Sequence, residues 1–160
     1  MITEAALERQ DIAALAQAFP GEDAILSGDI VRGEHVLHIA PAQIVPVLRF
    51  LKTQGYERLS TVTCVDWHPA DPRFDVVYHL HSLKHNRRVR LKTKVGGEKP
   101  SLESATSVYP SADWYEREVF DLFGVTFTGH PDLRRLLMPE YWEGHPLRKD
   151  FPTDGYKYDY

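Results

Sequence analysis

Two spacings of hydrophobic residues alternate along the chain, and together they predict a mixed α and β protein. A helical spacing runs over residues 3–19, where Thr3 stands at the cap position and Pro20-Gly21 ends the pattern. A second helix is expected from Pro41, a residue suited to the first helical position, to a stop at Gly55. Its apolar stripe is formed by Ile44, Leu48 and Leu51.

Five strands are predicted around the second helix. They are the β-branched and aromatic stretches Ala24–Ile30, Glu34–Ala40, Leu59–Trp67, Phe74–Leu83 and Arg87–Val95. An Arg32-Gly33 turn joins the first two, and His85-Asn86 is the expected two-residue turn between the last two. The glycines, charges and proline of residues 96–100 indicate a loop.

The expected hairpin has a definite register. A two-residue turn at His85-Asn86 sets Leu80 opposite Leu91 and Val76 opposite Val95. The other face then pairs His81 with Arg90, and His79 with Lys92. One apolar face and one cationic face are typical of an antiparallel pair that is buried on one side.

A last helix is expected to end at Gly124, and its charges are placed unusually. Ser111 or Asp113 would cap it, and Asp113 with Glu116 resembles a capping box. At about 100° per residue, one arc is apolar and the opposite arc carries charges of alternating sign, namely Asp113, Arg117 and Asp121. Glu116 and Glu118 fall on the flanks of the apolar arc, where a buried charge needs a partner.

The residues after Phe127 are predicted to form an extended arm. Every window there is interrupted by proline, at Pro131, Pro139, Pro146 and Pro152. The same residues are too apolar for a solvated tail, so the arm is expected to lie across another surface. The predicted fold is therefore a single α+β domain of order α-β-β-α-β-β-β-α. It has a mostly antiparallel or mixed sheet, a body at residues 1–127 and an extended C-terminal arm at residues 128–160.

Composition excludes several kinds of site. Cys64 is the single cysteine, so the chain has no intrachain disulfide, no cysteine zinc site and no iron–sulfur cluster of its own. The net charge of −4 gives no general case for nucleic acid or an anionic membrane. No signal peptide pattern is visible and no apolar run approaches about 20 residues, so no direct membrane insertion is expected.

Two catalytic interpretations compete with simpler ones. His130 and His145, near Glu140 and Glu143, could bind a metal, but their spacing matches no metal motif, so hydrogen bonds within turns are favoured. A carboxylate site could be built from Glu116, Glu118 and Asp121. The chain has no nucleotide- or flavin-binding glycine loop, no Walker A motif and no nucleophile elbow. We therefore favour a simpler role for these carboxylates, as a helix cap and as ion-pair partners of Arg117, Arg134 and Arg135.

Two binding surfaces are also indicated. Seven Lys or Arg lie between Lys84 and Lys99, but no aromatic residues interleave on that face, so nucleic-acid binding is not favoured over a solvated face. The arm concentrates residue types that are enriched at the cores of protein interfaces: Arg134, Arg135, Arg148, Tyr141, Trp142 and Met138. An arm that lies on a neighbouring protein would account for all six of these residues as contacts.

One long motif resembles that of a known family. It begins with Glu116-Arg117-Glu118 and, after two residues, Asp121-Leu122-Phe123-Gly124. It continues through Phe127, Gly129-His130-Pro131-Asp132-Leu133, Arg135 and Leu137-Met138-Pro139, and ends with Glu143-Gly144-His145-Pro146-Leu147-Arg148-Lys149-Asp150-Phe151-Pro152. The motif resembles that of the 30 kDa subunit family of respiratory complex I, the proton-translocating NADH:quinone oxidoreductase, in which bacterial members are called the C subunit. The strand Thr61–Asp66 is also similar to the family.

The resemblance implies a structural subunit in the peripheral arm of that enzyme. Electrons would pass from NADH through FMN and iron–sulfur centres, all in partner subunits, to quinone. The implied partners are the large subunit that shapes the quinone cavity and neighbouring iron–sulfur subunits. The implied location is the cytoplasmic side of the bacterial inner membrane, peripheral and held through the complex.

The motif residues that the resemblance assigns to the interface are Glu116, Arg117, Glu118, Asp121, Phe123, Gly124, His130, Asp132, Arg134, Arg135, Trp142, His145, Arg148 and Asp150. Two alternatives stay open. One is the equivalent subunit of a membrane-bound hydrogenase-type complex. The other is a stand-alone metal-dependent hydrolase that uses Glu116, Glu118, His130 and His145.

Overall fold

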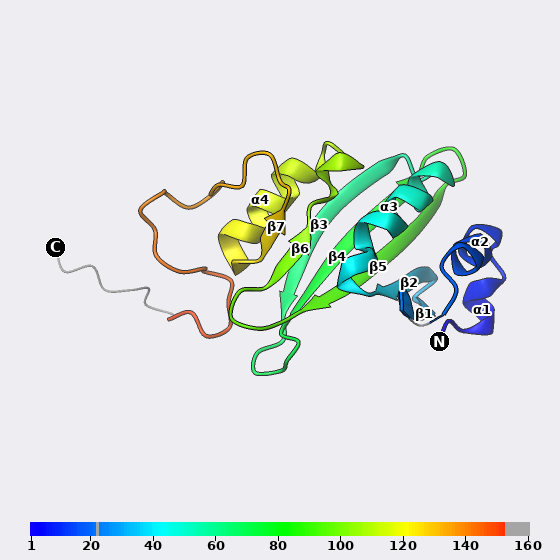
Figure 1. Ribbon diagram of the computed structural model, residues 1–160, viewed down its shortest axis with the longest axis horizontal. Coiled ribbons are helices and arrows are strands. Elements are labelled where there is room, and N and C mark those ends of the chain that lie inside the picture. The colour runs from blue at the N-terminus through cyan, green and yellow to red at the C-terminus, as the bar shows by residue number, and fades with distance from the viewer. Residues whose placement is uncertain (22, 153–160) are drawn as a thin grey trace.

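A five-stranded sheet forms the centre of the body (Figure 1). The computed structural model describes residues 1–21 and 23–152. The strands lie in the order β1-β2-β5-β4-β3, and every neighbouring pair is antiparallel except β2 with β5. Their bounds are β1 Ile25–Val31, β2 Glu34–Ile39, β3 Arg58–Asp66, β4 Phe74–Ser82 and β5 Arg87–Val95. The predicted α+β class and mixed sheet are confirmed.

Four α-helices accompany the sheet in the described part of the chain. Their bounds are α1 Glu4–Leu7, α2 Gln10–Ala18, α3 Ile44–Thr53 and α4 Ala112–Phe123, with short 3₁₀ turns at Pro41–Gln43 and Ala105–Ser107. The single helix predicted over residues 3–19 is wrong, because Arg9 is extended and separates two helices. Thr3 stands before α1 but makes no side-chain cap, and its hydroxyl donates to Asp29 instead.

A second, parallel pair of strands was not predicted. It joins β6 (Ser101–Glu103) to β7 (Thr126–Thr128). Each strand has three residues, too few for an alternating pattern to show in the sequence. The pair holds the end of α4 against the body, because β7 follows directly on Val125, which is fully buried.

The hairpin turn is longer than expected. Ser82 pairs with Arg87, so the turn has four residues rather than two, and every pair is displaced by two positions. Leu91 therefore faces Tyr78, not Leu80. The carboxylate of Glu57 accepts the N–H groups of two turn residues, Leu83 and Lys84, which explains the longer turn.

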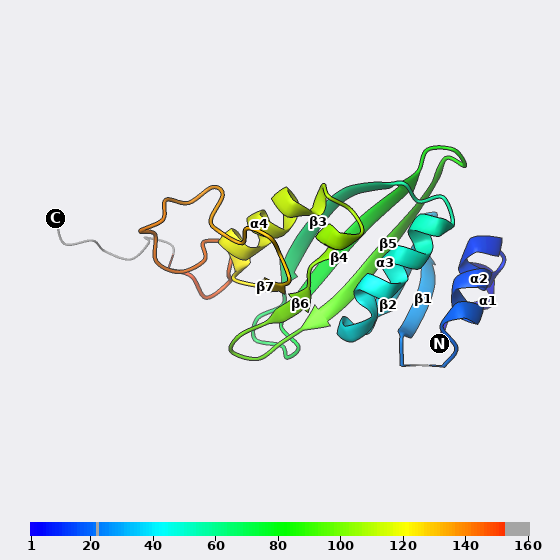
Figure 2. The same ribbon diagram turned by 45° about the horizontal axis from the view of Figure 1, so that its top comes forward.

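The sheet has one apolar and one polar face. Because the displacement of the hairpin is an even number of residues, the two faces stay as predicted. The apolar face packs against α3, which buries Ile44, Val47, Leu48 and Leu51 (Figure 2). Burying each such side chain contributes about 1.5–3 kcal/mol. The opposite face of β4 and β5 carries histidine, lysine and arginine.

Residues 129–152 contain neither a helix nor a strand. This stretch leaves β7 and bends around the outer end of α4 (Figure 1). We call residues 129–152 the arm. Thr128, the first residue of the predicted arm, belongs to β7, and residues 153–160 of that arm lie outside the described residues.

A buried carboxylate fixes the N-terminal helices to the body. Asp11 in α2 is 7% exposed and accepts hydrogen bonds from Arg9 at 2.8 Å and from the Tyr56 hydroxyl at 2.5 Å. Burial raises the pKa of Asp11, but the hydrogen bonds from Arg9 and Tyr56 outweigh it and leave the pKa below its usual range. The network joins α2 to the segment before β3.

Asp11→Asn is expected to destabilise the protein by about 1–3 kcal/mol, because two donors lose a charged acceptor. The folded-state pKa of Asp11 is depressed, so its contribution is present above the unfolded pKa and is lost as the pH falls. Urea unfolding at pH 7 and below pH 4 should therefore show a penalty that shrinks in acid. Asp23→Asn, at an exposed position, serves as the control and should cost little at either pH.

Candidate functional site

Asp121 in α4 is the residue that fixes the arm. Its side chain is fully buried, and Oδ2 accepts the backbone N–H groups of Leu136, Leu137 and Met138 at 2.9, 2.7 and 2.8 Å. Oδ1 accepts a bond from Arg135 at 2.6 Å. Burial raises the pKa of Asp121, but the four donors outweigh burial and hold the pKa below its usual range. The buried charge is therefore matched, as the predicted ion pair with Arg135 requires.

The arm also covers the C-terminal end of α4. The carbonyl oxygens of Asp121, Leu122 and Phe123 would lack partners within the helix. They accept hydrogen bonds from the arm, as follows: Arg135 and His145 to Asp121, the Leu147 N–H to Leu122, and Arg148 to Phe123. The two arginines also place positive charge at the negative end of the helix dipole.

Gly124 makes this close approach possible. It has φ +74° and ends α4 in the left-handed conformation that favours glycine. A Cβ at this position would collide with the His145 ring and would lie 2.5 Å from a guanidinium nitrogen of Arg148. The glycine therefore both stops the helix, as predicted, and admits the arm.

Arg117 and His130 hold the beginning of the arm. Arg117 donates to the carbonyl oxygens of Arg134 and Arg135, both at 3.3 Å, and its guanidinium lies 5.0 Å from the centre of the Trp114 ring. His130 Nε2 lies 3.2 Å from the Asp113 carbonyl oxygen. The charged arc of α4 thus faces the arm, not solvent.

Glu116 corrects the predicted capping box. Its carboxylate accepts the Ala105 N–H at 2.7 Å and the Ser104 hydroxyl at 2.6 Å, so it binds the 3₁₀ turn before α4 rather than the helix's own N-terminus. Ser111 makes no side-chain cap either. Glu116 is fully buried, and this burial raises its pKa to about 7. Glu118, in contrast, is exposed, so only one of the two flank carboxylates is buried.

A second attachment point lies at the far end of the arm. The buried Asp66 at the end of β3 accepts two hydrogen bonds from Arg73 at 2.7 Å and the backbone N–H of Lys149 at 2.7 Å. Arg73 also donates to Asp150. The sequence patterns did not single out Arg73. Its only signal was its position shortly after Asp66 across a Pro-rich turn.

The outward side of the arm and α4 exposes large apolar residues. The exposed fractions are 60% for Trp114, 55% for Leu137, 76% for Tyr141 and 50% for Leu147. Trp142 instead stacks on Phe151, with ring centres 6.5 Å apart. We call Trp114, Leu137, Tyr141 and Leu147 the outer apolar surface. The residues assigned to the interface divide accordingly into inward ones, such as Arg135, and surface ones, such as the pair Asp132 and Arg134.

Of the four residues of the metalloenzyme alternative, His130 and Glu116 lie together, with Nε2 and Oε2 4.0 Å apart, but His145 and the exposed Glu118 do not complete a site with them. His130 binds the first turn of α4 at Asp113, whereas His145 binds the carbonyl of Asp121, and eight residues of helix separate these points by about 12 Å. Within the part of the chain that the structure describes, no three His, Cys, Asp or Glu side chains lie close enough to hold a metal ion. Cys64 is buried, which raises its pKa to about 12 and makes it a poor nucleophile.

Comparison with known sequences gives one family. Residues 37–157 match the family described as "Respiratory-chain NADH dehydrogenase, 30 Kd subunit". The C subunit of the NADH-quinone oxidoreductase of Ruegeria sp. (strain TM1040) is 50% identical over 137 residues, which cover 84% of this chain and 68% of that protein. The mitochondrial NADH-ubiquinone oxidoreductase 30.4 kDa subunit of Neurospora crassa is 50% identical over 128 residues, 78% of this chain and 45% of that protein.

Solved structures share the fold. The "Nqo5 of the trypsin-resistant fragment (1-134)" superposes with a TM-score of 0.67 at 30% identity, covering 80% of this chain and 99% of the fragment. A chain of the membrane-bound sulfane sulfur reductase, an archaeal respiratory membrane complex, superposes with a TM-score of 0.73 at 27% identity. That match covers 89% of this chain and 84% of the other.

Asp121→Asn is expected to release the arm without unfolding the body, because an amide group cannot accept from all four donors. Trypsin should cleave after Arg134 and Arg135 at least about tenfold faster, which corresponds to about 1.4 kcal/mol of easier local opening. Asp132→Asn is the control, since the Asp132 side chain is 52% exposed and its ion pair among residues 1–21 and 23–152 is with the exposed Arg134. Equal cleavage rates for wild type and Asp121→Asn would contradict the role of Asp121.

Glu116→Gln is expected to change how stability depends on pH. The folded-state pKa of Glu116 is raised, so the folded state holds the proton more tightly and the group's contribution to stability declines as the pH rises from about 4.5 to about 7. The difference in unfolding free energy between wild type and variant, measured by urea titration across that window, isolates this group. The variant should gain relative stability toward pH 7, and Glu118→Gln, at an exposed position of the same helix, is the matched control.

Proposed function

The chain belongs to the family of the 30 kDa subunit of respiratory-chain NADH dehydrogenase, and we propose that it is a structural subunit of a proton-translocating NADH:quinone oxidoreductase. It acts in the peripheral arm of that enzyme, where electrons pass from NADH through FMN and iron–sulfur centres to quinone. Its task is assembly, that is, holding neighbouring subunits in place.

The arm carries this proposal. A segment without helix or strand is bound to α4 through Asp121 and to the sheet through Asp66, so its path is fixed before any partner arrives. The same segment turns Leu137, Tyr141 and Leu147 outward. Large exposed apolar residues on a preformed surface are typical of a protein interface. Preorganisation lowers the entropic cost of association.

We infer the partners from the family to which the chain belongs. The large subunit that shapes the quinone cavity takes the outer apolar surface, and neighbouring iron–sulfur subunits of the peripheral arm adjoin the body. The FMN and the clusters belong to those partners. No helix in the described residues is long and apolar enough to cross a membrane. The chain is held at the cytoplasmic side of the bacterial inner membrane through the complex.

A hydrogenase-type or related respiratory complex is the second candidate. The likeness to a chain of the archaeal sulfane sulfur reductase supports it, because that protein shares the fold at 27% identity. The NADH-quinone oxidoreductase relatives are 50% identical over 137 residues, and this favours the quinone-reducing enzyme. The metal-dependent hydrolase is not supported, because His130 and His145 bind opposite ends of α4.

Removal of the residues after Gly129 is expected to leave a folded body that fails to join the enzyme. The large hydrophobic core lies in the body, and of the arm residues only Leu133 packs partly against it. Far-UV circular dichroism tests folding, and copurification of the other subunits with the tagged chain tests assembly. Normal incorporation of the truncated chain would refute the role of the arm.

Point substitutions in the same copurification experiment test the outer apolar surface alone. Tyr141→Ala with Leu147→Ala should lower copurification while the arm stays bound to α4. Leu26→Ala with Val31→Ala removes comparably exposed apolar side chains from β1, away from the arm, and should not.

A further inference from the structure

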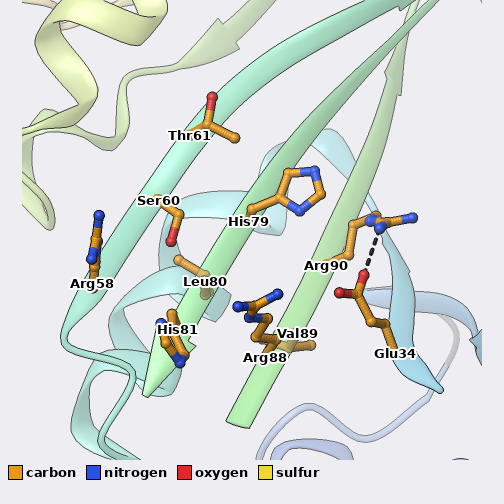
Figure 3. A pocket seen from close by; sticks show the side chains of 10 residues that line it. All are labelled: Glu34, Arg58, Ser60, Thr61, His79, Leu80, His81, Arg88, Val89 and Arg90. Atoms are coloured by element: carbon orange, nitrogen blue, oxygen red, sulfur yellow. Dashed lines mark hydrogen bonds and ion pairs between the residues drawn. The ribbon is translucent and has the colours of Figure 1, made fainter. Parts of the chain in front are cut away.

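The polar face of the sheet carries a row of cations that the arm does not use. Arg58 in β3 pairs with His81 in β4, and His81 pairs with Arg88 in β5, so three adjacent strands place these side chains side by side (Figure 3). The next row places His79 opposite Arg90. This row stands near the hairpin end of the sheet, whereas the arm is attached at the end where Asp66 lies.

The charges in this row are not balanced within the described residues. Arg90 is paired with Glu34 at 2.5 Å, as the dashed line in Figure 3 shows. Neither Arg58 nor Arg88 has a carboxylate oxygen within 4.0 Å in residues 1–21 and 23–152, and both are exposed. Arg58 and Arg88 flank His81 two strand spacings apart, so the two guanidinium charges repel each other. A bound anion would offset that repulsion.

The row lines an open groove of about 420 Å³. Leu80 and Val89 also line it but are only 1% exposed, so the arginine and histidine side chains, with their apolar stems, form its accessible wall. Small-molecule sites are usually enclosed and lined mainly by hydrophobic side chains, whereas this groove is open and lined by basic ones. Its shape and charge suit a charged segment of a larger molecule.

We propose that this groove binds an acidic segment of another subunit, with carboxylates placed against Arg58, His81 and Arg88. That this partner is a subunit of the same enzyme rests on the proposed function. Arg58 and Arg88 stand two strand spacings apart, about 10 Å, and two carboxylates on alternate residues of an extended segment stand about 6.6 Å apart. Flexible arginine side chains span that difference and bind carboxylates in bidentate fashion.

Other anionic partners fit the groove less well. Among the described residues no Phe, Tyr or Trp lines it, so nucleic-acid bases would lack the large aromatic rings on which they usually stack. Glu34 lies at its edge and repels a continuous phosphate backbone. The apolar residues that line the groove, Leu80 and Val89, are covered, so a membrane surface would find no apolar side chain to contact inside it.

Charge reversal tests the groove in the whole complex. Arg58→Glu with Arg88→Glu should reduce the tagged chain's copurification with the other subunits by about tenfold, or about 1.4 kcal/mol, and more at low salt. Arg49→Glu with Lys99→Glu, which reverses two exposed cations elsewhere, should leave assembly unchanged. Unchanged assembly of the groove variant would overturn the inference. If the wild-type chain itself failed to copurify, the proposed function would fail instead.

Zero-length cross-linking identifies the partner's chemistry. Arg58→Lys with Arg88→Lys keeps the charges and supplies amines that a carbodiimide joins to carboxylates in contact. Mass spectrometry of the cross-linked complex should find positions 58 and 88 joined to Asp or Glu of another subunit. Links confined to this chain would overturn the inference.

A competition with isolated full-length chain separates the classes of anion. A fluorescent peptide of alternating Glu and Ala should bind more tightly than a single-stranded oligonucleotide of equal charge or vesicles containing anionic lipid. The groove charge reversal should abolish its binding. Tighter binding of the oligonucleotide or the vesicles would count against an acidic protein segment.

Discussion

The burial of the Asp121 carboxylate is the constraint on which the path of the arm depends. This carboxylate is a full charge removed from water, and such a charge is tolerated only when donors replace its hydration. Three consecutive backbone N–H groups and one guanidinium do so here. Because those backbone groups belong to a segment with no helix or strand, the helix supplies the hydrogen-bond acceptor that the segment cannot find in itself. Asp121 thereby gives the N–H groups of the arm an acceptor, and the arm gives the buried carboxylate its donors.

The arrangement of the body brings α4 and the arm together so that these hydrogen bonds can form. Burial of the apolar face of the sheet under α3 leaves α4 at the edge, close to β3 and the short β6–β7 pair. The carbonyl groups at the end of α4 and the carboxylate of Asp66 both face the arm. The dipole of the helix, the glycine at its end and the strand terminus thus act together on the same stretch of chain.

Periodicity in the sequence was enough to predict the sheet, the helix over α3, the helix over α4 and its stop at Gly124. Local patterns were less reliable where tertiary contacts competed with them. The hairpin turn looked like a two-residue turn until Glu57, which is distant in sequence, bound its N–H groups. Glu116 matched a capping box by spacing, yet its carboxylate binds Ala105. Acceptors of this kind cannot be assigned from spacing alone, because their partners are brought together only by the fold.

The arm illustrates the same limit from the other side. Its composition predicted an arm laid on a neighbouring protein, and that contact stays a prediction; the structure shows that the arm is bound to the helix α4 of its own chain. Residues such as Arg135 and His145, which looked like contacts for a neighbour, bind α4. The residues left for a neighbour are the plainer apolar ones, including Tyr141.

Strands β4 and β5 have nine residues each, a length of about 30 Å, and they separate the Arg58 row from the attachment point of the arm at Asp66. The length of the strands therefore sets the distance between the Arg58 row and Asp66. Inserting one residue into a strand would turn the side chains beyond it to the wrong face. Inserting two residues in every strand would keep the faces and increase that distance by about 6.6 Å. The distance between the two ends of the sheet can therefore change only in steps of two residues. Proteins bound at both ends would have to be separated by a distance that follows the same steps.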